Sequence, residues 1–163
     1  MANKPNTEPQ TPKPGDIPPE RSAALEALDA LVGEWSYEGS HAMIPGAVLR
    51  GKTTFEWLEG KRFLIKRETI DHPEMPDSIS IIGADGPSAP LLEHYFDSRG
   101  VSRVYQMSFS DRTWKRWRDH PGFSRRSTGG LSEDGKTITT GSELSRDGVN
   151  WERDLDVTYM RLE

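Results

Sequence analysis

The 163-residue sequence contains no cysteine, which excludes disulfides, thiolate nucleophiles and cysteine-ligated metals. It also lacks any apolar run long enough to span a membrane, and its N-terminus lacks the apolar stretch of a signal peptide. We therefore predict no membrane association and expect a cytoplasmic protein. The net charge of −5 argues against nucleic-acid binding, because phosphates are attracted by a basic field.

Bulky apolar side chains are scarce in residues 1–19, which hold six of the twelve prolines. Such a segment cannot bury enough surface to offset the entropy lost on ordering, so we predict a disordered tail. Residues 20–163 are predicted to form a single domain. Its first element is a short helix, because apolar residues recur at helical spacing from Ala24 to Val32 and Gly33 follows as a stop.

From Trp35 onward, short segments rich in Val, Ile, Thr and aromatic residues alternate with turn signals such as Asp134-Gly135 and Asp147-Gly148. We predict about ten strands and a mainly β fold. An up-and-down antiparallel barrel is favoured over a sandwich, because closure removes exposed strand edges. The predicted strands lie near residues 34–41, 47–58, 62–71, 78–84, 91–97, 101–109, 113–118, 122–128, 136–144 and 150–161.

Residues at the two ends of this domain resemble a known family. Gly33 and Trp35 form a Gly-x-Trp motif in the first strand, and Arg161 lies in the last strand. This combination resembles the calycins, which include lipocalins, fatty-acid-binding proteins and nitrobindin. The resemblance implies that Arg161 packs on Trp35 and closes the barrel, with cation–π energy as the gain. Residues 55–64 and 94–100 are similar to a bacterial family of calycin-like barrels of unassigned function.

Nitrobindin binds haem through a histidine near the end of its chain. Here the last histidine is His120, and the final strand, residues 157–161, contains none. Haem binding is therefore a disfavoured alternative, and we predict no cofactor. The four histidines also lack the spacing of a metal motif, so we predict no metal site.

The hairpin around residues 97–100 gives the most specific prediction of a site. If these four residues form the turn, alternation assigns one set of side chains to the barrel interior. That set is Leu92, His94, Phe96, Val101, Arg103, Tyr105, Met107 and Phe109. A four-residue turn over residues 110–113 would add Trp114, Arg116 and Arg118, whereas a slip of one residue would send Trp117 inward instead.

The predicted lumen thus holds His94, Arg103, Tyr105, Arg116 and Arg118 among apolar walls. A cationic cluster beside a tyrosine suits a carboxylate or phosphate on an apolar body. The resemblance to fatty-acid-binding proteins implies a similar arginine–tyrosine arrangement. The alternative is that these arginines lie outside and form cross-strand ion pairs.

Tyr37 and His41 share a strand face with Trp35 and are further candidates for the cavity wall. Their alternative role is that of ordinary core and rim residues. Asp154 and Asp156 alternate with their neighbours, so we predict that they form the solvent face of the last strand and have no acid–base role.

We predict a small-molecule-binding barrel whose lumen takes a small hydrophobic or anionic ligand, in a monomer or homodimer. An isomerase or hydrolase is the alternative, with His94 or Glu68 as a proton-transfer group of shifted pKa. A lumen filled by side chains is a further alternative, in which the protein has a structural or interaction role.

Overall fold

The computed structural model describes residues 13, 15 and 20–163. The predicted tail, residues 1–19, falls outside the described residues except for Lys13 and Gly15. Within the described part of the chain, no helix has the length and apolarity needed to cross a membrane.

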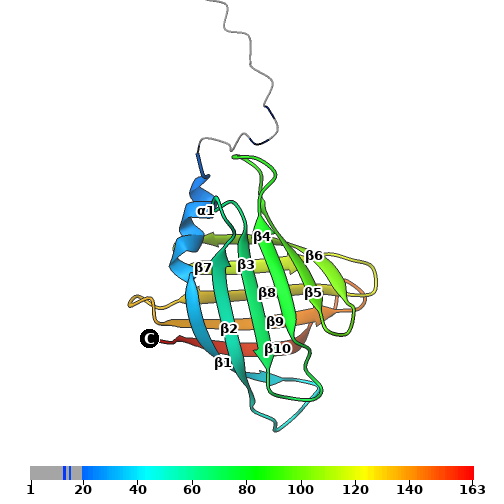
Figure 1. The fold of residues 1–163 in the computed structure, drawn as a ribbon. Coiled ribbons are helices and arrows are strands. Elements are labelled where there is room, and N and C mark those ends of the chain that lie inside the picture. The colour runs from blue at the N-terminus through cyan, green and yellow to red at the C-terminus, as the bar shows by residue number, and fades with distance from the viewer. Residues whose placement is uncertain (1–12, 14, 16–19) are drawn as a thin grey trace, which may run out of the picture.

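Ten antiparallel strands form a closed barrel in which each strand pairs with its neighbours in sequence and the last pairs with the first (Figure 1). A short α-helix, α1 (Ala23–Ala27), and a 3₁₀ helix, η1 (Leu28–Leu31), precede them. This architecture confirms the predicted up-and-down barrel with its N-terminal helix. The strands are β1 (Gly33–His41), β2 (Leu49–Trp57), β3 (Leu64–Ile70), β4 (Ser78–Gly83), β5 (Leu91–Asp97), β6 (Ser102–Ser110), β7 (Thr113–Arg118), β8 (Ser124–Leu131), β9 (Thr137–Ser145) and β10 (Glu152–Arg161).

The helical segment closes one end of the barrel. It leads directly into β1 yet lies against β6, on the opposite side of the ring of strands. Leu25, Leu28 and Leu31 are buried there, in a core shared with apolar residues of the surrounding strands. Ser22 caps the helix by accepting a hydrogen bond from the Leu25 N–H at 3.3 Å. The apolar core therefore fills this end and leaves the other end for a site.

Arg161 joins the end of the chain to its beginning. Its guanidinium lies 4.1 Å from the centroid of the fully buried Trp35 ring. It donates hydrogen bonds to the carbonyls of Val32 at 2.7 Å, Ala30 at 2.7 Å and Gly135 at 3.0 Å. Gly33 is needed beside it, because its φ is 134° and a Cβ would lie 2.9 Å from Arg161 Nη1. These contacts fix the seam between β1 and β10.

The β5–β6 hairpin has a different register from the predicted one. The Asp97 N–H bonds to the Val101 carbonyl at 3.0 Å, so the loop contains three residues, 98–100, and not four. Phe96 consequently pairs with Ser102 and His94 with Val104. Because a shift of one residue turns every side chain of a strand to the other face, β5 is reversed relative to the prediction.

The β6–β7 hairpin has the predicted four-residue turn. Ser110 pairs with Thr113, and the two residues between them, Asp111 and Arg112, have positive φ values of 49° and 60°. This is the backbone of a tight type I′ hairpin. The turn places Trp114 on the inward face of β7.

Candidate functional site

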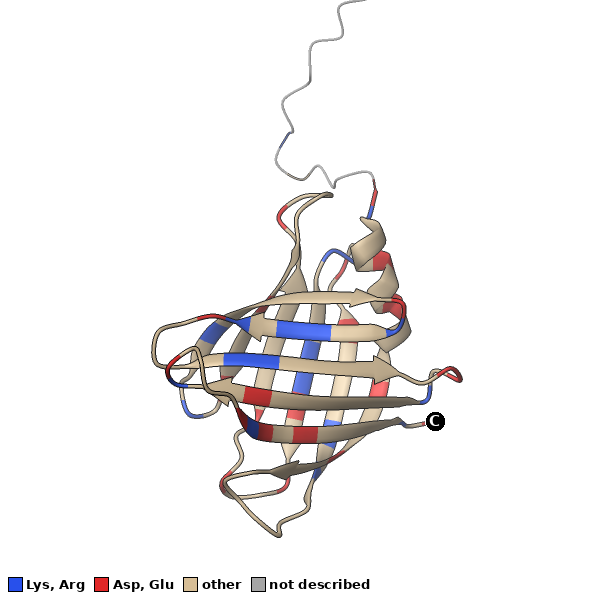
Figure 2. Ribbon diagram, turned by 180° about the vertical axis from the view of Figure 1, so that it is seen from behind, with Lys and Arg blue, Asp and Glu red and all other residues tan. Residues whose placement is uncertain are grey.

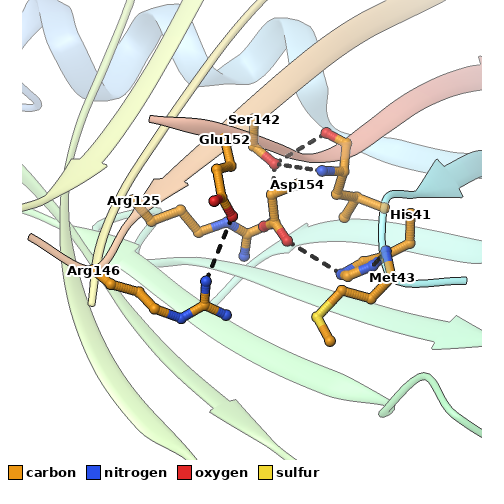
Figure 3. Close-up of polar contacts among 8 residues, drawn as sticks. His41, Met43, Arg125, Ser142, Arg146, Glu152 and Asp154 are labelled. Carbon is orange, nitrogen blue, oxygen red and sulfur yellow. Dashed lines mark hydrogen bonds and ion pairs between the residues drawn. The ribbon is translucent and has the colours of Figure 1, made fainter. Parts of the chain in front are cut away.

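A cavity of about 440 Å³ occupies the lumen at the end away from the helical segment. Its wall is formed by residues near the ends of β1, β3, β5, β7 and β9 and the starts of β4, β6, β8 and β10, with Ile44 and Met75 from two connecting loops. Figure 3 shows part of this wall, where side chains from β1, β8, β9 and β10 meet. The barrel therefore has an apolar closed end and, at the opposite end, a cavity lined by both charged and apolar side chains.

Three carboxylates of the cavity wall have a cationic partner inside the barrel. Buried ions require such partners, because removal from water is otherwise too costly. The pairs are Lys66–Glu68 at 2.9 Å, Arg116–Glu93 at 2.6 Å and Arg125–Asp154 at 2.9 Å. The wall is thus an array of compensated charges.

Glu68 is the most heavily bonded of these carboxylates. In addition to Lys66, it accepts hydrogen bonds from Thr53 Oγ1 at 3.0 Å and the Tyr159 hydroxyl at 3.2 Å. Burial acts to raise the pKa of Glu68, but Lys66 and the two hydroxyl donors outweigh it and hold that pKa below its usual value. A carboxylate held ionised in this way is poorly suited to proton transfer near neutral pH.

Arg116 lies at the centre of the lumen, between the aromatic rings of two neighbouring strands. Its guanidinium carbon is 3.7 Å from the ring centroid of Tyr105 and 5.6 Å from that of Tyr95. Its Nε and the Glu93 carboxylate are close but not aligned as a hydrogen bond, and its Nη2 has no hydrogen-bond partner among the described residues. Arg116 therefore retains N–H groups for a further acceptor.

The charges around Tyr105 change its acidity. Burial acts to raise the pKa of Tyr105, but the guanidinium groups of Arg116, Arg125 and Arg103 outweigh it and lower that pKa below its usual value. This direction indicates a positive electrostatic potential in this part of the lumen.

His41 is held on both sides of its ring at the mouth of the cavity (Figure 3). Its Nδ1 accepts a hydrogen bond from the Met43 N–H at 3.1 Å, and its Nε2 lies 3.2 Å from Asp154 Oδ1. Asp154 in turn contacts Arg125, which donates to Ser142 Oγ at 3.1 Å. An axial haem ligand needs a ring nitrogen facing the iron, so His41 does not fit that role.

The prediction that Asp154 and Asp156 both face solvent is wrong for Asp154, which is buried. The pairing of β10 with β9 shifts between Arg153 and Asp156, which is a β-bulge. Ser142 Oγ fills the irregularity, donating to the Leu155 carbonyl at 3.0 Å and accepting from the Leu155 N–H at 3.2 Å. Asp154 and Leu155 therefore both line the cavity, whereas Asp156 pairs with Arg153 on the outside.

Arg103 differs from the other cations of the wall. Its guanidinium carbon lies 4.2 Å from the Phe123 ring centroid, near the mouth. Within residues 20–163 it has no carboxylate at ion-pair distance, whereas each other Lys or Arg of the wall has one. Those paired residues are Lys66, Arg99, Arg116, Arg125 and Arg146.

The structure brings together only part of the predicted site. Arg103, Arg116 and His41 line the cavity, and Tyr105 is buried behind Arg116. The prediction that His94 faces the lumen is wrong, because the reversed β5 places its exposed side chain outside.

Two further candidates lie beside the cavity and not in its wall. Arg118 donates from Nη1 to the Phe123 carbonyl at 3.0 Å and thereby braces the β7–β8 loop. Tyr37 is buried in the core, edge-on to Tyr159 with ring centroids 5.5 Å apart. Glu93 was not predicted as a site residue. The predicted register of the β5–β6 hairpin differs from the observed one by one residue and placed the Glu93 side chain on the solvent side.

No family model matches this chain, and no curated protein matches it. The crystal structure of Rv2717c from M. tuberculosis is similar, with a TM-score of 0.67 and 13% sequence identity. The match covers 88% of this chain and 100% of that chain. At this level of identity the likeness supports the fold alone. It agrees with a calycin-like barrel in coarse outline.

Proposed function

We propose that this barrel binds a small anionic molecule whose carboxylate or phosphate group contacts Arg103. The observation that carries the proposal is that Arg103, among the described residues, has no carboxylate at ion-pair distance, in a wall where the other cations are compensated. An anion beside an unpaired guanidinium forms charge-assisted hydrogen bonds, which are among the stronger polar contacts of proteins.

The balance of charge around the cavity also singles out Arg103. The wall contains six Lys or Arg side chains and four Asp or Glu side chains, and Asp97 and Glu152 pair with Arg99 and Arg146 beside it. Cations and carboxylates are therefore equal in number, and among the described residues Arg103 is the cation that no carboxylate contacts. An anion at Arg103 would meet a positive charge without displacing an existing ion pair.

The hydroxyl groups of the wall favour a compact polar ligand over a long aliphatic one. The hydroxyls of Ser127 and Thr140 line the cavity, as does Arg116, whose Nε and Nη2 have no hydrogen-bond partner among the described residues. A hydrocarbon chain would bury these groups without hydrogen bonds, which is unfavourable. Of the two predicted ligand classes, anionic and hydrophobic, the wall supports the anionic one, with Phe123 and its apolar neighbours accommodating a short apolar portion.

Binding is better supported than catalysis. Glu68 is held as a carboxylate by Lys66 and two hydroxyl donors, and both ring nitrogens of His41 are engaged. General acid–base catalysis needs a group that gains and loses a proton near the working pH. Glu68 is instead kept ionised by its partners, and His94, the other predicted proton-transfer group, lies outside the barrel.

The test begins with native mass spectrometry of the full chain purified from its own host, to detect a small molecule that leaves on denaturation. Calorimetric titration then uses inorganic phosphate and a panel of short mono-, di- and hydroxycarboxylates. We expect an anion to bind, and Arg103→Gln to weaken it by about tenfold to a hundredfold, since a charge-assisted hydrogen bond contributes about 1.5–3 kcal/mol. Which member of the panel binds distinguishes a carboxylate from a phosphate.

Arg126→Gln is the matched control, because Arg126 lies on the outer face of β8 and pairs with Glu143 at 2.8 Å. We expect this variant to bind as the unchanged chain does. Equal affinity in both variants would refute the role of Arg103. A sample with no bound molecule and no affinity for any anion of the panel would refute the proposal as a whole.

A further inference from the structure

The outer surface of the barrel has one sector without charged side chains. None of the outward positions on β4, β5 and β6 is occupied by Asp, Glu, Lys or Arg. Six apolar side chains gather there, which we call the apolar outer face: Phe63, Ile79, Ile81, Leu92, Phe96 and Val104. His94 lies among them, between Ile81 and Val104 on the neighbouring strands.

This face is exposed. The exposed fractions are 43% for Phe63, 37% for Ile81, 43% for Phe96 and 46% for Val104. Cross-strand pairing places Ile79 beside Phe96, so the apolar side chains are contiguous. A contiguous exposed apolar patch on a protein surface marks an interaction site.

The central strand of this face, β5, has its polar and apolar side chains on the reverse sides from those of a strand with one face in water. β5 directs Glu93 into the barrel and turns Leu92 and Phe96 outward. A strand with one face in water normally has its polar residues outside. The inversion is explained if the outer side of β5 is also covered.

A glycine extends the same face across β4. Gly83 lies on the outward side of β4, and Phe63 packs over it. A Cβ at Gly83 would lie 2.5 Å from Phe63 Cδ1, which is closer than real contacts allow. The absence of a side chain at Gly83 therefore lets the Phe63 ring lie over β4 and enlarge the patch.

The rest of the barrel exterior carries paired charges. Lys52 pairs with Glu34 at 2.7 Å across β1 and β2, and Arg67 with Glu56 at 3.4 Å across β2 and β3. Arg126 pairs with Glu143 across β8 and β9. Figure 2 shows the charged positions of the strands near the C-terminus. The apolar outer face thus lies between two charged sectors.

We propose that the apolar outer face is the interface of a homodimer, in which it packs against the same face of a second copy. A closed barrel offers no free strand edge, so a partner must pack on a face. Two copies that each carry a charge of −5 repel one another, and they meet with least repulsion through the uncharged sector. A twofold axis puts this sector against itself, and two twisted sheets can pack in that way.

The test is sedimentation velocity of the full chain over a wide range of concentrations. We expect a dimer that dissociates on dilution. Phe96→Glu should weaken the dimer by about a hundredfold or more, because it places a desolvated charge on both sides of the twofold axis. Met160→Glu is the control: Met160 is 59% exposed on the outer side of β10, away from the apolar outer face.

Circular dichroism and thermal melting establish that both variants fold before their masses are compared. A full chain that remains monomeric at the highest concentrations would overturn the proposal, even if it bound lipid vesicles or another protein. A dimer weakened equally by Phe96→Glu and Met160→Glu, or by neither, would overturn it as well. The lumen is not involved in this interface, so the outcome is independent of the proposed anion binding.

Discussion

Asp97 is a single carboxylate that organises the β5–β6 loop. It accepts hydrogen bonds from Arg99 Nη2 at 2.7 Å, the Tyr95 hydroxyl at 2.9 Å and the Arg99 N–H at 3.0 Å. Burial acts to raise its pKa, but these donors and the Val101 N–H outweigh it and lower the pKa to about 2. The ionised form is therefore the one that stabilises the folded loop.

This shift predicts a pH-dependent contribution to stability. Because the folded pKa of about 2 lies below the unfolded value, the stabilisation is complete above about pH 4 and is lost as the pH falls toward 2. We expect Asp97→Asn to lower the free energy of unfolding by about 1–2 kcal/mol at pH 7, and the difference to vanish near pH 2. Urea unfolding at several pH values measures it, with the exposed Asp71→Asn as control. A difference that stays constant with pH would contradict this assignment.

The contact between Trp35 and Arg161 was predicted from the resemblance to calycins. It is confirmed, because the two residues pair directly across β1 and β10 and the guanidinium covers the indole ring. Asp154 was misplaced because a β-bulge interrupts the alternation of β10, and no residue type in that stretch marks a bulge. His94 was misplaced because the outer face of β5 is more apolar than the inner one, so composition selected the wrong side.

At the scale of elements, turn length decides how reliable a hairpin prediction is. The loop between β6 and β7 contains an even number of residues, two, as the prediction assumed. Trp114 and Arg116 therefore face inward as predicted. The loop between β5 and β6 has three residues with Gly100 at φ 81°, and its odd count reverses β5. Both loops contain polar turn residues, which indicate that a turn exists but not its length.

The contribution of the helical segment to the stability of the barrel can be measured with a single substitution. Leu28 is fully buried in the core at the closed end of the barrel. We expect Leu28→Ala to lower the free energy of unfolding by about 2–5 kcal/mol, since it removes packed side-chain volume. Leu58→Ala, at a side chain that is 50% exposed, should cost less than about 1 kcal/mol. Denaturant unfolding measures both, and similar losses would show that the segment does not seal the core.

For the molecule as a whole, the strand pattern was enough to predict the barrel but not its cavity. Ten short strands with hairpin turns leave few architectures that have no exposed edge, and closure follows. The cavity instead depends on which side chains from nine of the ten strands meet in the lumen. Lys66, Glu93, Arg125 and Asp154 come from four different strands, and only the three-dimensional register brings their charges together.

Arg161 connects the last strand of the barrel to the first strand and the helical segment. Its three hydrogen bonds reach Ala30, Val32 and Gly135, and its guanidinium covers Trp35. We expect Arg161→Ala to lower the free energy of unfolding by about 2–4 kcal/mol, because three carbonyls lose a charged donor and the indole loses its cation.

Arg153→Ala is the matched control on the same strand, since Arg153 is exposed and pairs with Asp156 at the surface. It should change the free energy of unfolding by less than about 1 kcal/mol. Guanidinium unfolding followed by tryptophan fluorescence and by circular dichroism measures both variants, and coincident transitions would establish that the barrel unfolds as one unit. If the two variants were equally stable, closure would not depend on Arg161, and backbone pairing of β1 with β10 would hold the barrel closed without it.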